Sequence, residues 1–194
     1  MIEADLSAQK QANIFRSVLT AMSYPGRIVD FKIDTQTPPV GLSSEMAAVL
    51  LMLCDFQTPI WMKTKTPEIE KFLKFYTGAP ITTKKAEATF AIVHSSDTFS
   101  SLSEFAQGTH EYPDRSTTVL LQVEQLIDIG NIELTGPGIA TKTNFNAGNL
   151  APTFWNDVIA NHPNYPLGID LIFVAKNRIA AIPRSILIKI VEQR

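Results

Sequence analysis

Three short apolar runs, separated by segments with helical patterns, narrow the fold of this sequence more than any other feature. The runs are TFAIV at 89–93, TTVLLQV at 117–123 and GIDLIFV at 168–174. Each is too short for a buried helix, and an apolar run of this length is typical of a strand covered on both faces of a parallel sheet. We therefore expect an α/β protein built as a three-layer α/β/α sandwich, in which helices cover both faces of a mixed sheet.

Apolar spacing and end signals place the remaining elements. Helices are expected at 8–22, 43–55, 66–77, 97–108 and 152–159. Further strands are expected at 28–31, 59–62, 131–135, 179–182 and 186–191, with a hairpin turned at Lys176-Asn177. In the first helix one face is expected to be buried, formed by Ile14, Phe15, Val18, Leu19 and Met22.

Proline and glycine recur together where the chain must change direction. In YPGR at 24–27, Pro25 sets its own φ and Gly26 tolerates a positive φ, which predicts a type II turn between the first helix and a strand. Gly136-Pro137-Gly138 predicts a sharp exit from a strand. The sequence gives only weak support for an anion-binding loop at Gly136-Pro137-Gly138, because the stretch is short and has no lysine.

Length and composition indicate one soluble globular domain over residues 1–194. The chain is 45% hydrophobic and 19% charged, and it has no run of about 18 apolar residues that would span a membrane. Its net charge of −2 is spread without a basic block, which argues against nucleic acid or a membrane surface as partner. Cys54, the single cysteine, lies in an apolar run and is expected to be a buried hydrophobe in a cytoplasmic protein. The acids and amides of the first residues also favour the cytoplasm over export.

The common catalytic and cofactor motifs are missing from the sequence. It has no phosphate-binding loop, no dinucleotide fingerprint and no nucleophile elbow. His94, His110 and His162 are far apart and lack the spacing of metal ligands, so we expect them at strand ends or in loops. Standard phosphate-binding loops and serine hydrolases are therefore not supported by the sequence, and no metal site is expected.

Two groups of polar residues remain as candidates for function. The loop at 108–117 holds a dense cluster that includes Asp114 and Arg115, although any solvated loop can look like this. Asp170 and Arg184 interrupt apolar strand surroundings, and we expect them to pair across the hairpin. Such a pair is structural more often than catalytic, and burial would be costly unless it were fully hydrogen-bonded.

Five motifs in order give the chain its resemblance to a known family. They are FRSVLTAMSYPG at 15–26, YPDRSTT at 112–118, LTGPGI at 134–139, YPLGID at 165–170 and IPRS at 182–185. Together they resemble the PhnH family, the H subunit of the bacterial carbon-phosphorus lyase system. The last motif departs from the family's Pro-Arg-Thr-Thr, because Ile186 replaces the second hydroxyl residue, which leaves any role of that hydroxyl open.

The resemblance implies a fold similar to the pyridoxal-phosphate-dependent transferases, without their cofactor lysine site and without a cofactor. It also implies a homodimer that joins the G, I and J subunits in a core complex. In that system, partner subunits replace the adenine of ATP with an alkylphosphonate and later cleave the carbon-phosphorus bond. The H subunit has no established catalytic residue, so the resemblance implies an accessory role. The candidate contacts to partners or ligands are Pro25, Gly26, Asp114, Arg115, Gly136, Pro137, Gly138, Asp170 and Arg184.

Two other functions stay open at the level of sequence. A stand-alone α/β enzyme for a small anionic metabolite would bring Asp114, Arg115, Asp170 and Arg184 together in a pocket at strand ends. A pyridoxal-phosphate enzyme would need a lysine at the floor of a pocket to form a Schiff base. An accessory subunit differs from both enzymes because it needs rigid turns at its surface. Flexible turns would lose conformational entropy when a partner binds.

Overall fold

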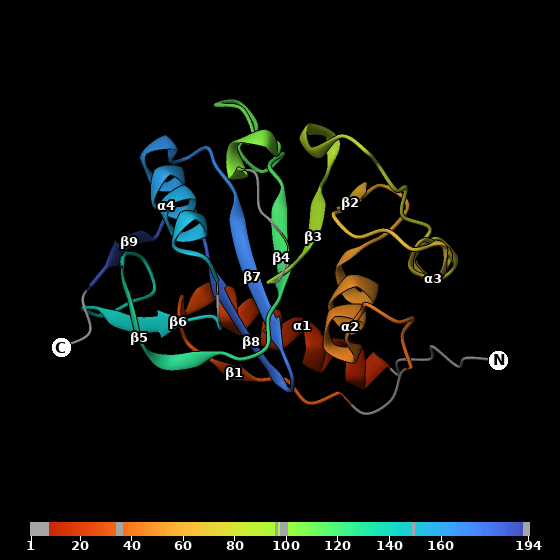
Figure 1. Ribbon diagram of the computed structural model, residues 1–194, viewed down its shortest axis with the longest axis horizontal. Coiled ribbons are helices and arrows are strands. Elements are labelled where there is room, and N and C mark those ends of the chain that lie inside the picture. The colour runs from red at the N-terminus through yellow and green to blue at the C-terminus, as the bar shows by residue number, and fades with distance from the viewer. Residues whose placement is uncertain (1–7, 34–36, 96, 98–100, 149, 192–194) are drawn as a thin grey trace.

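The computed structural model describes residues 8–33, 37–95, 97, 101–148 and 150–191, which form two β-sheets with helices packed around them (Figure 1). The α-helices are α1 (Ala8–Ser23), α2 (Ser44–Leu53), α3 (Pro67–Thr77) and α4 (Pro152–Asn161). The strands are β1 (Val29–Asp30), β2 (Ile60–Met62), β3 (Phe90–His94), β4 (Thr118–Gln122), β5 (Ile127–Thr135), β6 (Thr143–Asn146), β7 (Asp170–Ala175), β8 (Arg178–Ile182) and β9 (Leu187–Ile190).

The larger sheet is mixed, as the sequence predicts. The described residues place six strands in it, in the order β1-β8-β7-β4-β3-β2. The four strands β2, β3, β4 and β7 run parallel, while β8 lies antiparallel to both β7 and β1. His94, Gln122 and Val174 are in register across β3, β4 and β7, so these three strands end side by side.

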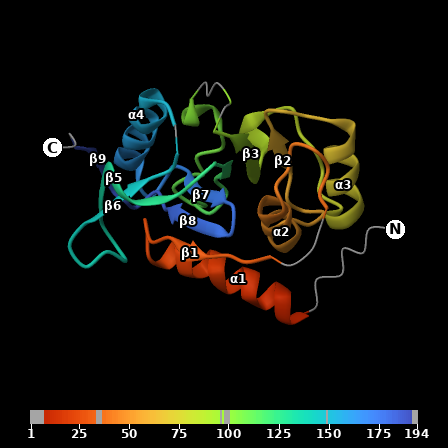
Figure 2. The ribbon, with the colours of Figure 1, turned by 60° about the horizontal axis from the view of Figure 1, so that its bottom comes forward.

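Side chains alternate between the two faces of this sheet and form a separate core on each. On β4, Val119 and Leu121 pack in the core shared with α4, whereas Leu120 packs in the core shared with α1, α2 and α3. Figure 2 shows α1 and α4 on opposite sides of β7 and β8. The predicted three-layer arrangement is therefore confirmed.

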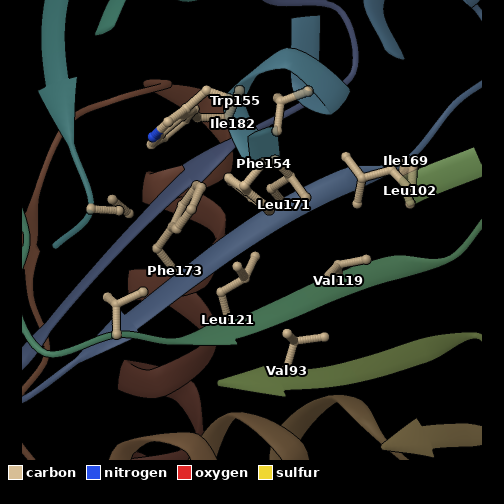
Figure 3. Close-up of a cluster of buried hydrophobic side chains, with 14 of the residues drawn as sticks. Val93, Leu102, Val119, Leu121, Phe154, Trp155, Ile169, Leu171, Phe173 and Ile182 are labelled. Atoms are coloured by element: carbon tan, nitrogen blue, oxygen red, sulfur yellow. The ribbon is translucent and has the colours of Figure 1, made fainter. Parts of the chain in front are cut away.

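Aromatic rings fill the core between the sheet and α4 (Figure 3). Trp155 stacks on Phe173 with their ring centroids 6.1 Å apart, and Phe154 meets Trp155 edge-on at 5.3 Å. Pro152 opens α4, and Phe154, Trp155 and Val158 lie on the face of the helix that is buried against the sheet. This core holds the second sheet in place as well, since Ile132, Leu134 and Ile188 belong to it.

Local signals account for the other helices. In α2, the Ser43 side chain accepts a hydrogen bond from the Met46 N–H, and apolar residues on all sides let the helix pack between α1, α3 and the sheet. In α3, Thr66 caps the start and Gly78 ends the helix with a left-handed φ of 71°.

The second sheet is a feature that the sequence analysis did not predict. In the described part of the chain it has three strands, in the order β6-β5-β9, all antiparallel. The strand expected at 131–135 begins earlier, at Ile127, and β6 was not expected at all because Phe145 is its single buried residue. The expected last strand exists as β9, but it pairs with β5 and not with the main sheet.

Two helix predictions need correction. In the described part of the segment expected to be helical at 97–108, the only helical turn is a 3₁₀ turn at Leu102–Glu104. Serine side chains bond the local backbone there, as Ser101 Oγ does with the Ser103 N–H, and Phe105 turns inward against Trp61. In α1, Phe15 and Leu19 are 48% and 53% exposed, because the buried stripe runs through Ile14, Val18 and Ala21.

None of the helices in the described ranges has both the length and the apolar character needed to cross a membrane.

Cys54 is buried as expected, and its surroundings make the thiol unreactive. Loss of hydration on burial is the main cause that raises the pKa of the Cys54 thiol from 9.0 to about 12; Asp55 raises it further, and a hydrogen bond with Thr58 lowers it in part. We expect a disulfide reagent at about pH 8 to react with Cys54 only as fast as the protein opens, which stopped-flow absorbance would measure.

The same pKa shift has a consequence for stability. Above pH 9 the thiol ionises in the unfolded chain but stays protonated in the folded protein, so the free energy of unfolding should fall as pH rises toward 12. The Cys54→Ala variant should lack this part of the pH dependence. Rapid labelling of the folded protein at about pH 8 would contradict the burial of this group.

Candidate functional site

Arg184 and Asp170 form the expected ion pair. Asp170 opens β7, Arg184 follows β8, and these strands are neighbours in the sheet. The Nε of Arg184 donates to Asp170 Oδ1 at 3.1 Å and its Nη2 donates to Oδ2 at 2.5 Å, while the Arg184 backbone N–H donates to Oδ1 at 2.9 Å. The side chains are 13% and 16% exposed, so the pair lies largely out of water. It is a multiply hydrogen-bonded pair, which is the condition under which a buried pair is tolerated.

The same guanidinium also holds the polar loop before β4. Its Nη1 donates to the backbone oxygen of Pro113 at 2.7 Å, and its Nη2 donates to Ser116 Oγ. Arg184 therefore joins β7, the connection from β8 to β9, and the turn at 113–116. All these bonds are to the protein itself, so the arrangement favours a structural role for Arg184.

Asp114 and Arg115 do not join this network. Both are exposed, and the Arg115 guanidinium lies over the Tyr112 ring, 4.1 Å from its centroid. The loop contributes a backbone oxygen and a serine hydroxyl to Arg184 in place of its charged side chains. The polar set expected of a stand-alone enzyme is thus divided, with Asp170 and Arg184 bound to each other and the other two in solvent.

The two Pro/Gly stretches meet each other. Tyr24–Arg27 closes with a hydrogen bond from the Arg27 N–H to the Tyr24 oxygen at 3.0 Å, and Gly26 has a φ of 76°, as expected for a type II turn. A Cβ on Gly138 would overlap the backbone oxygen of Ser23 and lie 2.8 Å from Pro25 Cδ. The loop at 136–138 therefore packs directly against the turn, and only glycine permits this contact.

Contacts connect the glycine loop to the Arg184 network. A Cβ on Gly136 would lie 3.2 Å from the Ser185 backbone oxygen and 3.1 Å from Ile186 Cδ1. The residues directly after Arg184 thus touch the glycine loop, which touches the turn at 24–27. We call this continuous set the corner cluster, formed by 23–26, Pro113, Ser116, 136–138, 170 and 184–186.

The corner cluster meets the sheet at the amino ends of its parallel strands. Asp170 is the first residue of β7 and is in register with Thr118, the first residue of β4. In open α/β sheets, ligands bind outside the opposite, carboxyl ends. The position of the cluster therefore favours a role in building the fold.

A hollow at the carboxyl ends was not predicted. It has a volume of about 550 Å³ and is lined from β3, β4, β7 and the start of α2, including His94, Gln122, Glu124 and Lys176. The signal that could have found it is a polar residue shortly after each of the three buried apolar runs: His94 and Glu124 directly follow theirs, and Lys176 comes two residues after the third. Among the described residues no group of three or more His, Cys, Asp or Glu side chains could hold a metal ion.

Comparison with known proteins identifies the family. The model of the family described as bacterial phosphonate metabolism protein (PhnH) matches residues 4–189. This chain belongs to the PhnH family. All five motifs of the sequence analysis lie inside the matched segment, so the resemblance inferred from them is confirmed.

Two curated relatives of this PhnH-family chain carry related names. The alpha-D-ribose 1-methylphosphonate 5-triphosphate synthase subunit PhnH of Rhizobium meliloti (strain 1021) is 34% identical over 178 residues, covering 89% of this chain and 87% of the relative. HtxG of Stutzerimonas stutzeri, named as a C-P lyase subunit protein, is 26% identical over 178 residues, covering 92% and 85%.

The structure shows what the PhnH-family motifs have in common. The turn at 24–27 touches the loop at 136–138, which touches 185–186, and Arg184 bonds both Asp170 and the turn at 113–116. All five motifs therefore contribute to the corner cluster, although they lie far apart in the sequence. Seven of the candidate residues belong to it, namely Pro25, Gly26, Gly136, Pro137, Gly138, Asp170 and Arg184, whereas Asp114 and Arg115 do not.

Proposed function

We propose that this chain is an accessory subunit of a carbon-phosphorus lyase complex in phosphonate breakdown, without catalytic residues of its own. Membership of the PhnH family and the names of the two relatives support the assignment to phosphonate metabolism. The observation that carries the accessory role is that Asp170 and Arg184 form their hydrogen bonds with each other and with neighbouring protein groups. They do so at the amino ends of the parallel strands, the end opposite to the usual ligand sites.

The proposal extends to the partners. By resemblance to the family, the chain forms a homodimer and joins the G, I and J subunits. Those partners would replace the adenine of ATP with an alkylphosphonate and cleave the carbon-phosphorus bond. We also place the complex in the cytoplasm, the reducing compartment that a single unpaired cysteine favours.

The corner cluster suits a protein that works by docking. Pro25 restricts its own φ, and the glycines at 136 and 138 are held by contacts with neighbouring backbone. A surface loop fixed in this way loses little conformational entropy when a partner binds, so more of the contact energy remains as affinity. Gly136, Pro137 and Gly138 are exposed, so a partner can reach them.

Purification of the tagged full-length chain from cells grown on a phosphonate tests the proposal. We expect the other subunits to copurify and to be identified by mass spectrometry, with an unrelated tagged protein as the control. Recovery of this chain alone, from cells in which the other subunits are present, would contradict the proposal. So would turnover of a phosphonate or nucleotide by the isolated protein that is lost in a folded Asp170→Asn variant.

A further inference from the structure

The hollow at the carboxyl ends of β3, β4 and β7 has the position and size of a ligand site. Its volume of about 550 Å³ lies within the range of small-molecule pockets. Strand β3 ends at His94 and leads into Ser95, β4 leads into Glu124, and β7 leads into Lys176. The corner cluster lies at the other end of these strands, so the hollow is a separate feature of the molecule.

A chain of hydrogen bonds sets the proton position on His94. The Ser43 N–H donates to Gln122 Oε1 at 2.8 Å, so the Gln122 amide nitrogen is the atom 3.3 Å from His94 Nδ1. An amide nitrogen can only donate, so Nδ1 accepts and the ring proton is on Nε2. The main chain of Gln122 is also fixed, because its oxygen accepts from the Ser95 N–H at 2.9 Å. The Nε2–H of His94 is therefore left to donate into the hollow.

Among the charged and imidazole side chains that line the hollow, three present a group with no protein partner in the described part of the chain. They are the Nε2–H of His94, the ammonium of Lys176 and the carboxylate of Glu124. The other carboxylate of the lining, Glu45, accepts a hydrogen bond from the Asn177 N–H at 3.0 Å. The three unpaired groups come from three adjacent strands, and their formal charges sum to zero.

These groups favour a neutral ligand rich in hydroxyls. The carboxylates of Glu45 and Glu124 would repel an anionic ligand, and the ammonium of Lys176 would repel a cationic one. A hydroxyl group both donates and accepts, so two adjacent hydroxyls can donate to the Glu124 carboxylate while their oxygens accept from Lys176 and His94. Apolar ligands find few partners, since Val123, Val174 and Ala175 are the apolar members of the lining.

We propose that the hollow binds the adjacent hydroxyls of a small sugar ring, with Glu124 as the acceptor and Lys176 and His94 as the donors. This inference rests on the hollow alone and is independent of the proposed role in a complex. If the protein assembled with partner subunits but bound no sugar, this inference would be overturned and the proposed accessory role would stand.

Titration of the full chain with D-ribose, followed by two-dimensional NMR, tests the proposal. We expect saturable shifts at His94, Gln122 and Lys176, with a dissociation constant of about 1 mM, as for a small polar ligand. 2-Deoxy-D-ribose keeps one of the three adjacent hydroxyl pairs of the ribose ring, the pair at C3 and C4, so it should bind about threefold more weakly.

The Glu124→Gln variant should lose affinity for D-ribose by about tenfold, the loss of one hydrogen bond to a charged group. Glu124 is exposed, so the substitution leaves the fold intact, and Glu111→Gln, an exposed carboxylate in the loop before β4, is the matched control with unchanged affinity. Three results would overturn the proposal: no saturable shift at the hollow, binding of ribose 5-phosphate without binding of ribose, or binding of L-alanine in place of the sugar.

Discussion

Replacing Arg184 with alanine should lower the free energy of unfolding by about 3 kcal/mol. The substitution leaves Asp170 largely buried, with its carboxylate stripped of both guanidinium bonds, and it also frees the Pro113 oxygen and Ser116 Oγ. We expect the low end of the usual range for a broken buried pair, because the backbone N–H of residue 184 can still donate to Asp170. Urea unfolding followed by circular dichroism measures the effect.

Arg115→Ala is the matched control for this prediction. Arg115 is also an arginine of the corner region, but it is exposed and its guanidinium lies on Tyr112. We expect its replacement to change stability by no more than about 0.5 kcal/mol. Equal, small effects of the two substitutions would show that Arg184 does not hold the corner cluster together.

Replacing Gly138 with alanine should cost roughly 3 kcal/mol for two separate reasons. Gly138 has a φ of 85°, a conformation in which a Cβ is strained by about 1–2 kcal/mol. The new methyl would also overlap the Ser23 oxygen and press on Pro25, so the loop must move away from the turn at 24–27. Thermal unfolding monitored by calorimetry measures the loss.

Gly148→Ala separates the two reasons. Gly148 has a φ of 60°, but the nearest atom to an added Cβ would be 3.6 Å away, an ordinary contact. We expect it to cost only the backbone term, about 1–2 kcal/mol. If both alanine variants lost the same stability, the packing of the glycine loop against the turn would contribute nothing.

The elements predicted best from the sequence are those whose signals are local. The helix α3 has a capping threonine, a proline and a terminal glycine within its own residues, and the strands β3, β4 and β7 are continuous apolar runs. In contrast, the segment at 97–108 contains apolar residues at helical spacing that in fact serve contacts with distant residues, as Phe105 does with Trp61. Spacing alone could not show this, because the partner is more than 40 residues away in the chain.

The candidate site shows the same division. The pairing of Asp170 with Arg184 could be predicted, because a hairpin places neighbouring strands side by side. That the guanidinium would also reach Pro113 and Ser116, while Asp114 and Arg115 stay in solvent, depends on how a loop from another part of the chain packs. The hollow could not be predicted for the same reason, because its lining comes from four segments that are separate in the sequence.

By itself the sequence determined the α/β class, the order and boundaries of most elements, the turn at Pro25-Gly26 and the family. These depend on interactions within a few residues, or on motifs read in order along the chain. The tertiary structure alone decided that β5, β6 and β9 form a second sheet and that five motifs meet in one cluster. It also decided that the His94 Nε2–H, Glu124 and Lys176 line a hollow without a partner among the described residues. Burial and hydrogen-bond satisfaction are properties of the packed chain, because they depend on which distant segments exclude water from each other.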